Sequence, residues 1–110
     1  MTMLGKHTSR SFVVRTISSQ SMRMVNICDE ELLDKTVQSK NLKMHISKDY
    51  FGHELMSEQD TIDILRKCPM ANLVGKRIID KVISEKLASP NAVKTIEEVP
   101  FLMIYKFPRA

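Results

Sequence analysis

The chain has 110 residues, of which 43% are hydrophobic and 27% are charged, and its formal net charge is +4. This length fits one domain, and this balance is typical of a soluble globular protein and excludes wholesale disorder. No stretch approaches the ~18 uninterrupted apolar residues of a membrane helix, and the first twenty residues lack the continuous apolar region of a secretory signal, so we expect a cytoplasmic protein that does not associate with membranes.

The positive excess is confined to the N-terminal part of the chain. Residues 24–110 carry thirteen basic and thirteen acidic side chains, whereas residues 1–23 carry no acid and four basic residues: Lys6, Arg10, Arg15 and Arg23. Residues 1–10 have no apolar periodicity. We therefore predict a flexible basic arm over residues 1–10, followed by a single domain over residues 11–110.

The first predicted elements are two β-strands and a short helix. Phe12–Ile17 and Met22–Cys28 are rich in β-branched or alternating apolar residues and flank the polar "SSQS", which predicts a β-hairpin. Asp29 follows as an N-cap, with Glu30 and Glu31 in the first turn of a helix that ends at Lys35. In this interpretation the carboxylates begin a helix and Cys28 points into the core.

The rest of the chain alternates between strand and helix patterns. Leu42–Ile46 alternates apolar and basic residues and predicts a half-buried strand of the sheet, and the "KDYFGHEL" stretch after it predicts a loop. Helices are predicted over Ser57–Lys67, with Ser57 as its cap, and over Leu73–Leu87; Ser89 and Pro90 predict a brief turn, and Phe101–Phe107 a final strand. We predict an α+β fold: a small antiparallel or mixed sheet, two main helices on one face and a short helix at the edge.

Four segments of the chain resemble a known family. The ordered motifs "CDEELL", "YFGHEL", "ANLVGKR" and "VPFLMI" resemble an archaeal family catalogued as domain of unknown function 424, over about residues 12–107. The resemblance implies an archaeal cytoplasmic protein of small α+β fold, and it implies no activity. Its motif positions have no assigned role: Cys28, Asp29, Glu31, Gly52, Glu54, Asn72, Gly75 and Pro100. The chain departs from the family pattern at Asp34, His53, Lys76 and Phe101, and the last of these stands where the family has a histidine.

An enzyme would use Cys28 as a nucleophile with His45 or His53 as its base, or would pair Glu54 with Asp29 or Glu31 as acid and base. The carboxylates beside the thiol should raise its pKa, which disfavours the first mechanism. The chain has two cysteines far apart, three histidines and no paired metal-ligand motif, so we predict neither a metal nor a cofactor and name no catalytic residue.

A binding module is the interpretation that the charge pattern favours. No acid lies between Lys35 and Lys48. These lysines, the N-terminal basic residues and two neighbouring aromatic side chains form a candidate surface for RNA or for ribosome-associated material. The hypothesis names Lys6, Arg10, Arg15, Arg23, Lys35, Lys40, Lys43, Lys48, Tyr50 and Phe51. Two alternatives stay open: the lysines only protect a strand edge, or the eight methionines form a surface for a protein partner or a homo-oligomer.

Overall fold

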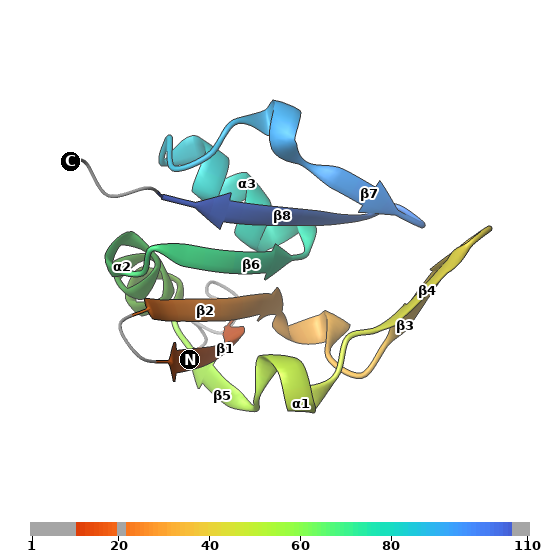
Figure 1. The fold of residues 1–110 in the computed structure, drawn as a ribbon, viewed down its shortest axis with the longest axis horizontal. Helices are drawn as coiled ribbons and strands as arrows, with labels where there is room; N and C mark the ends of the chain where they lie inside the picture. The colour runs from red at the N-terminus through yellow and green to blue at the C-terminus, as the bar shows by residue number, and fades with distance from the viewer. Residues whose placement is uncertain (1–10, 20–21, 107–110) are drawn as a thin grey trace, which may run out of the picture.

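The structure is a computed structural model that describes residues 11–19 and 22–106. Six strands form one mixed sheet in the order β5-β1-β2-β6-β8-β7 (Figure 1). The central pair β2–β6 is parallel, and the other neighbours are antiparallel. The strands are β1 Phe12–Ser19, β2 Met22–Asp29, β5 Glu54–Met56, β6 Met70–Val74, β7 Lys94–Ile96 and β8 Val99–Tyr105.

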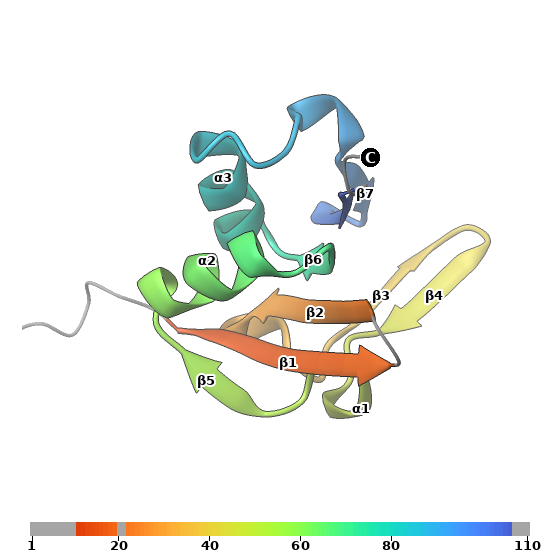
Figure 2. The same cartoon turned by 60° about the vertical axis from the view of Figure 1, so that its left-hand side comes forward.

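Two helices cover one face of this sheet. These are α2, Glu58–Lys67, and α3, Lys76–Ser84, and Figure 2 shows both on the same side of β1, β2 and β6. Ile27 of β2, Leu65 of α2 and Ile78 of α3 are among the buried residues of the core between the layers. The α+β class and the placement of two main helices on one face are thus confirmed.

The opposite face of the sheet is only partly covered. The one-turn helix α1, Lys48–Phe51, lies there, and a two-stranded hairpin of β3, Thr36–Ser39, and β4, Leu42–His45, projects from the body (Figure 2). A second buried cluster under these elements includes Val37, Ile46 and Phe51. Within the described part of the chain, no helix lies on the rest of this face, over β6 and β8 (Figure 1).

The predicted helix Leu73–Leu87 is wrong in its first turn and too long at its end. Residues 70–74 form the central strand β6, and α3 runs only from Lys76 to Ser84. Val74 matched the helical spacing of Ile78 and Val82, but Val74 belongs to the cluster on the other face of the sheet. Gly75, with φ +121°, separates strand from helix, and a periodic apolar stripe does not reveal such a break.

The prediction that Leu42–Ile46 is a half-buried strand of the main sheet is also wrong. Residues 42–45 pair with β3 in a separate sheet, and all four side chains are exposed. Strands β3, β5 and β7 were not predicted, because runs of three or four residues carry too little periodicity. The helix predicted over Asp29–Lys35 is reduced to a 3₁₀ turn, Glu30–Leu32.

Several local predictions hold. The Ser57 hydroxyl accepts a hydrogen bond from the Asp60 N–H at 3.1 Å and caps α2, and a 3₁₀ turn, Pro90–Ala92, follows Ser89. The predicted first hairpin is present, and its register, which the sequence left open, pairs residues 12–17 with 24–29. The last strand begins two residues earlier than predicted, at Val99, and its predicted end, Phe107, lies outside the described residues.

Candidate functional site

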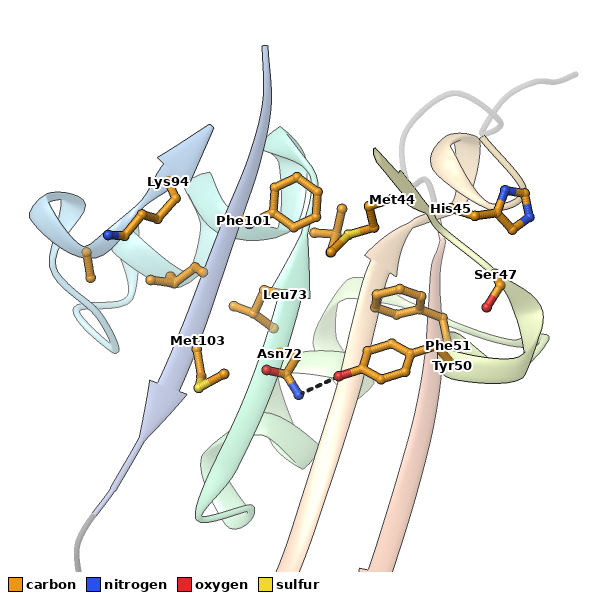
Figure 3. A pocket seen from close by; sticks show the side chains of 13 residues that line it. Met44, His45, Ser47, Tyr50, Phe51, Asn72, Leu73, Lys94, Phe101 and Met103 are labelled. Carbon is orange, nitrogen blue, oxygen red and sulfur yellow. Dashed lines mark hydrogen bonds between the residues drawn. The ribbon is translucent and has the colours of Figure 1, made fainter. Parts of the chain in front are cut away.

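A hollow lies on the face of the sheet that α2 and α3 leave uncovered. It is a groove of about 630 Å³ between the base of the β3–β4 hairpin with α1 on one side and β8 with the Pro90–Ala92 turn on the other. We call it the sheet groove. Its lining is mostly apolar, with Phe101 and Met103 of β8 facing Tyr50 of α1 across β6 (Figure 3). No acidic residue is among the described residues that line it. Many sites that bind small molecules are mostly apolar hollows of this volume.

The strand alternation explains why these side chains gather here. Asn72 on β6 lies opposite Met103 on β8, and directly paired residues project from the same face. Met103 is 63% exposed and Tyr50 is 47% exposed. The groove therefore presents apolar and aromatic surface to solvent that the helices leave uncovered.

A polar network lies at the floor of the groove. Asn26 of β2 is fully buried, and its side-chain N–H donates to the Tyr50 carbonyl at 3.0 Å. The Asn72 side-chain N–H₂ donates to Asn26 Oδ1 at 2.9 Å and to the Tyr50 hydroxyl at 3.3 Å, as Figure 3 shows for the second of these. Buried amides keep such positions only when their hydrogen bonds are satisfied, so the network fixes Tyr50 against the sheet.

The β3–β4 hairpin borders the groove and carries basic residues on its other face. Val37 pairs with Met44, and this face turns toward the body, where Val37 is buried and Met44 lines the groove. Lys43 pairs with Gln38 and, by the alternation of the strand, projects from the opposite face. The hairpin thus contributes a groove wall and exposed lysines, and at its edge the Gln38 N–H donates to the Glu97 carboxylate at 2.7 Å.

The predicted RNA-binding residues form two groups rather than one surface. Lys35, Lys40 and Lys43 lie on or beside the hairpin and are exposed. Lys48 belongs to α1, and the Arg15 side chain donates to the Asp49 carbonyl of the same helix. Tyr50, in this helix too, lines the groove.

Other members of the predicted set do not join these groups. Arg23 is exposed near the start of β2, and its position in the strand places it on the same side as Val25, which belongs to the helix-side core. Phe51 is 3% exposed and packs in the second core cluster, so the prediction that it is a stacking surface is wrong. Lys6 and Arg10, together with the predicted arm over residues 1–10, lie outside the described residues.

The Cys28 thiol is enclosed. It is 0% exposed at the end of β2, and burial, followed by the charges of Asp29 and Glu31, raises its pKa to about 12. A thiol with this pKa is protonated at neutral pH, whereas reactive cysteines sit in electropositive, accessible surroundings. The candidate bases His45 and His53 are both exposed. The arrangement therefore does not supply an activated thiol.

The prediction that the Asp29 side chain caps the turn that follows it is wrong. The side chain caps α3 instead. Its two carboxylate oxygens accept the backbone N–H groups of Arg77 and Ile78, each at 2.9 Å. Burial raises the pKa of Asp29, and these two hydrogen bonds oppose the rise. Because both oxygens are bound, Asp29 is not placed to act as a general base with Glu54, which is exposed on β5.

The residues around Asp29 complete a junction between β2, α3 and the chain entering β1. Arg77 forms a bidentate ion pair with Glu31 at 2.7 and 2.9 Å, and its guanidinium lies 4.7 Å above the Phe12 ring. The Gly75 N–H donates to the Pro100 carbonyl at 2.9 Å. A Cβ at position 75 would lie 2.8 Å from Asp29 Oδ1 and closer still to Cγ and Oδ2, so only glycine leaves room for the capping carboxylate.

Positions where the chain departs from the family pattern also have local explanations. Asp34, in place of a glycine, has φ +71°, a conformation that aspartate tolerates better than most residues. Lys76 begins α3 and pairs with Asp80 at 2.8 Å. Phe101, in place of a histidine, lines the sheet groove.

A family model for proteins of unknown function, DUF424, matches residues 17–107. The chain belongs to this family. The crystal structure of an uncharacterized conserved protein from Methanopyrus kandleri resembles this DUF424 protein with a TM-score of 0.80 and 19% sequence identity, over 91% of this chain and 95% of that chain. This likeness establishes a shared fold. No curated protein matches the sequence.

The described residues contain neither a cluster of metal ligands nor a membrane-spanning helix. Within residues 11–19 and 22–106, no three histidine, cysteine or acidic side chains come together as metal ligands. No helix in this part of the chain has the length and apolar character needed to cross a membrane.

Sequence reasoning missed most of the groove. Lys94 and Phe101 were not named as site residues, Met103 was included only in the alternative of a methionine surface, and Asn72 was named only as a motif position. The alternation of Phe101, Met103 and Tyr105 is visible in the sequence and predicts that these side chains share one face. It does not reveal which face the helices cover, and that decides which side chains are free to bind.

Proposed function

We propose that this DUF424 protein is a non-catalytic binding module that takes unpaired RNA along the sheet groove and the β3–β4 hairpin. The observation that carries the proposal is that a groove with exposed aromatic and apolar lining, free of acidic residues, lies beside a projecting hairpin with exposed lysines. Proteins bind single strands by combining cationic groups for the phosphates with surfaces on which bases stack.

The hairpin contributes the phosphate contacts in this proposal. Lys40 lies at its turn and Lys43 on its outer face, and no acid occurs between Lys35 and Lys48. An extended pair of strands with little packing of its own is marginal alone, since only Val37 of it is buried. Its projection favours a role outside the core of the domain.

The groove contributes the base contacts. Tyr50 gives a ring that is nearly half exposed, Met103 an exposed thioether, and Lys94 a cation at the rim. Base stacking on such side chains contributes about 1–3 kcal/mol per base and tolerates any sequence. A translation-linked RNA is consistent with this surface, because single-stranded loops offer splayed bases.

Salt-dependent binding of a fluorescent, unstructured twelve-nucleotide RNA tests the proposal. The affinity should fall with salt, and Lys40→Gln with Lys43→Gln should lower the slope of log K against log salt by about 1.4, from about 0.7 for each phosphate contact. The matched control is Lys67→Gln with Lys86→Gln on the helix side, which should leave the slope unchanged. Undetectable binding, or equal effects of the two double variants, would overturn the proposal.

The alternative occupant is an apolar peptide of a protein partner or of a second copy of the chain. This alternative predicts that the RNA does not bind, and that light scattering gives a mass above that of the monomer. Such a result would favour the methionine-lined surface as a protein interface.

A further inference from the structure

We infer that Asn72 and Tyr50 form a recognition pair for the edge of one nucleobase at the floor of the sheet groove. This inference rests on the proposed function and adds to it a site with a defined hydrogen-bonding preference. The argument starts from the orientation of two side-chain amides, which the surrounding backbone determines.

The orientation of Asn26 is set by a backbone carbonyl. Its Nδ2 donates to the Tyr50 carbonyl oxygen at 3.0 Å, and only the amide nitrogen can make this bond. Its Oδ1 must therefore face Asn72, and it accepts from Asn72 Nδ2 at 2.9 Å. The amide of Asn72 is consequently fixed as well, with its nitrogen toward Asn26 and Tyr50.

This arrangement leaves one acceptor and one donor available in the groove. Figure 3 shows the oxygen of Asn72 on the side toward Met103, and this oxygen accepts no hydrogen bond from the described residues. The Tyr50 hydroxyl oxygen accepts from Asn72 at 3.3 Å, so the hydroxyl proton is not used in that contact and can be donated elsewhere. An acceptor and a donor thus lie side by side at the groove floor.

The chemistry of the ligand follows from this pair. Adenine and cytosine present an amino donor beside a ring-nitrogen acceptor, and the edges of uracil and guanine also place a donor next to an acceptor. A phosphate group offers acceptors only. It could accept a hydrogen bond from the Tyr50 hydroxyl, but its oxygens would be repelled by the Asn72 oxygen. The pair therefore suits a base and disfavours a phosphate.

The surrounding side chains suit a flat ligand. Phe101 and Met103 line one wall, and the Tyr50 ring lines the other (Figure 3). Methionine sulfur and aromatic faces both pack favourably on flat rings. Lys94, which lines the same groove, is available to the phosphate attached to the bound nucleotide. We therefore place a single unstacked base in the groove, with its edge toward β6 and its phosphate toward the rim.

The test compares an intact eight-nucleotide RNA with the same oligomer made fully abasic, using the full chain. Tyr50→Phe removes only the hydroxyl and keeps the ring and the backbone carbonyl that holds Asn26. It should weaken binding of the intact oligomer about two- to tenfold, the range expected for one hydrogen bond, and leave binding of the abasic oligomer unchanged. Tyr105→Phe is the matched control, because Tyr105 is a tyrosine of similar exposure on the same sheet that does not line the groove; it should change neither.

The outcomes separate this inference from the proposed function. If RNA binds but Tyr50→Phe behaves as the wild type, the recognition pair is refuted and RNA binding stands. If neither oligomer binds, the proposed function itself fails. A second measurement follows the Asn72 side-chain amide by NMR on addition of cytidine monophosphate or ribose 5-phosphate: only the nucleotide should shift it, and equal shifts with both would overturn the pair.

Discussion

Gly75 and Asp29 should be energetically coupled, because each makes the conformation of the other possible. Substituting Gly75 by alanine puts a residue with a Cβ at φ +121°, which costs about 1–3 kcal/mol of unfolding free energy. It also drives the Cβ into the Asp29 carboxylate, which must move and lose its bonds to the N–H groups of Arg77 and Ile78. Overlap of this kind costs about 1–3 kcal/mol more.

Asp29→Ala alone should destabilise the domain by about 1–3 kcal/mol, since it leaves the first turn of α3 without its acceptors. In the double variant the overlap is absent and the cap is already lost, so only the backbone strain at position 75 is added. The double variant should therefore be more stable than the sum of the two single effects implies, by about 1–3 kcal/mol.

Urea unfolding followed by circular dichroism measures the four corners of this cycle. The control is Gly52→Ala, because Gly52 also has positive φ, +76°, but its added Cβ would meet Arg15 Cβ at 3.2 Å and not Asp29. Its effect should add to that of Asp29→Ala within about 0.5 kcal/mol. Additivity of Asp29→Ala with Gly75→Ala to the same tolerance would refute the proposed coupling.

Three further predictions concern the thiol, the buried amide and the hairpin. Because the pKa of Cys28 is about 12 in the folded state, above its unfolded value, its contribution to stability is complete below the unfolded pKa and is lost as pH rises toward 12. The wild type should lose about 1.4 kcal/mol per pH unit above about pH 9 relative to Cys28→Ala in urea titrations, and parallel pH profiles would contradict this. Asn26→Ala should cost about 1–3 kcal/mol of unfolding free energy, because it removes the side-chain donor to the Tyr50 carbonyl and the 2.9 Å acceptor of the Asn72 amide; a cost below about 0.5 kcal/mol would contradict the network. Replacing residues 36–45 by Asn-Gly should lower the unfolding free energy by less than about 3 kcal/mol, because Val37 is the buried residue that is lost. A two-residue turn can close the gap, because the Ile46 N–H already donates to the Lys35 carbonyl at 2.8 Å. Loss of a cooperative unfolding transition would show that the hairpin is part of the core.

The sequence predicted the elements whose signals are local. The cap at Ser57 and the first hairpin depend on side chains within a few positions of each other, and both appear as predicted. The sequence also predicted that the pKa of Cys28 is raised; burial is the largest cause of the rise, and the neighbouring carboxylates, which are visible in the sequence, add to it. Fold class followed from the alternation of strand and helix patterns.

What failed depended on contacts between distant residues. Asp29 looks like the cap of the turn that follows it, but its partners are 48 and 49 residues away, at the start of α3. Strand β6 looked like the first turn of a helix because its apolar residues share the helical spacing of α3, and only the left-handed Gly75 separates the two. Local patterns give the same signal for both arrangements, so the tertiary structure decides between them.

Four of the family-motif positions lie at the junction with α3, and Asn72 lies at the sheet groove. This difference shows where to look for a function. Asp29, Glu31 and Gly75 join β2 to α3 through the cap and the Arg77 ion pair, and Pro100 receives the Gly75 N–H. Their chemistry is therefore explained by the construction of the fold. Asn72 is different: it lies in the middle of β6, where its amide donates to the buried Asn26 oxygen and to the Tyr50 hydroxyl in the groove. The amide nitrogen of Asn72 thus serves the fold by satisfying the buried Asn26 oxygen, whereas its own oxygen faces the groove, so experiments on ligands should begin with Asn72.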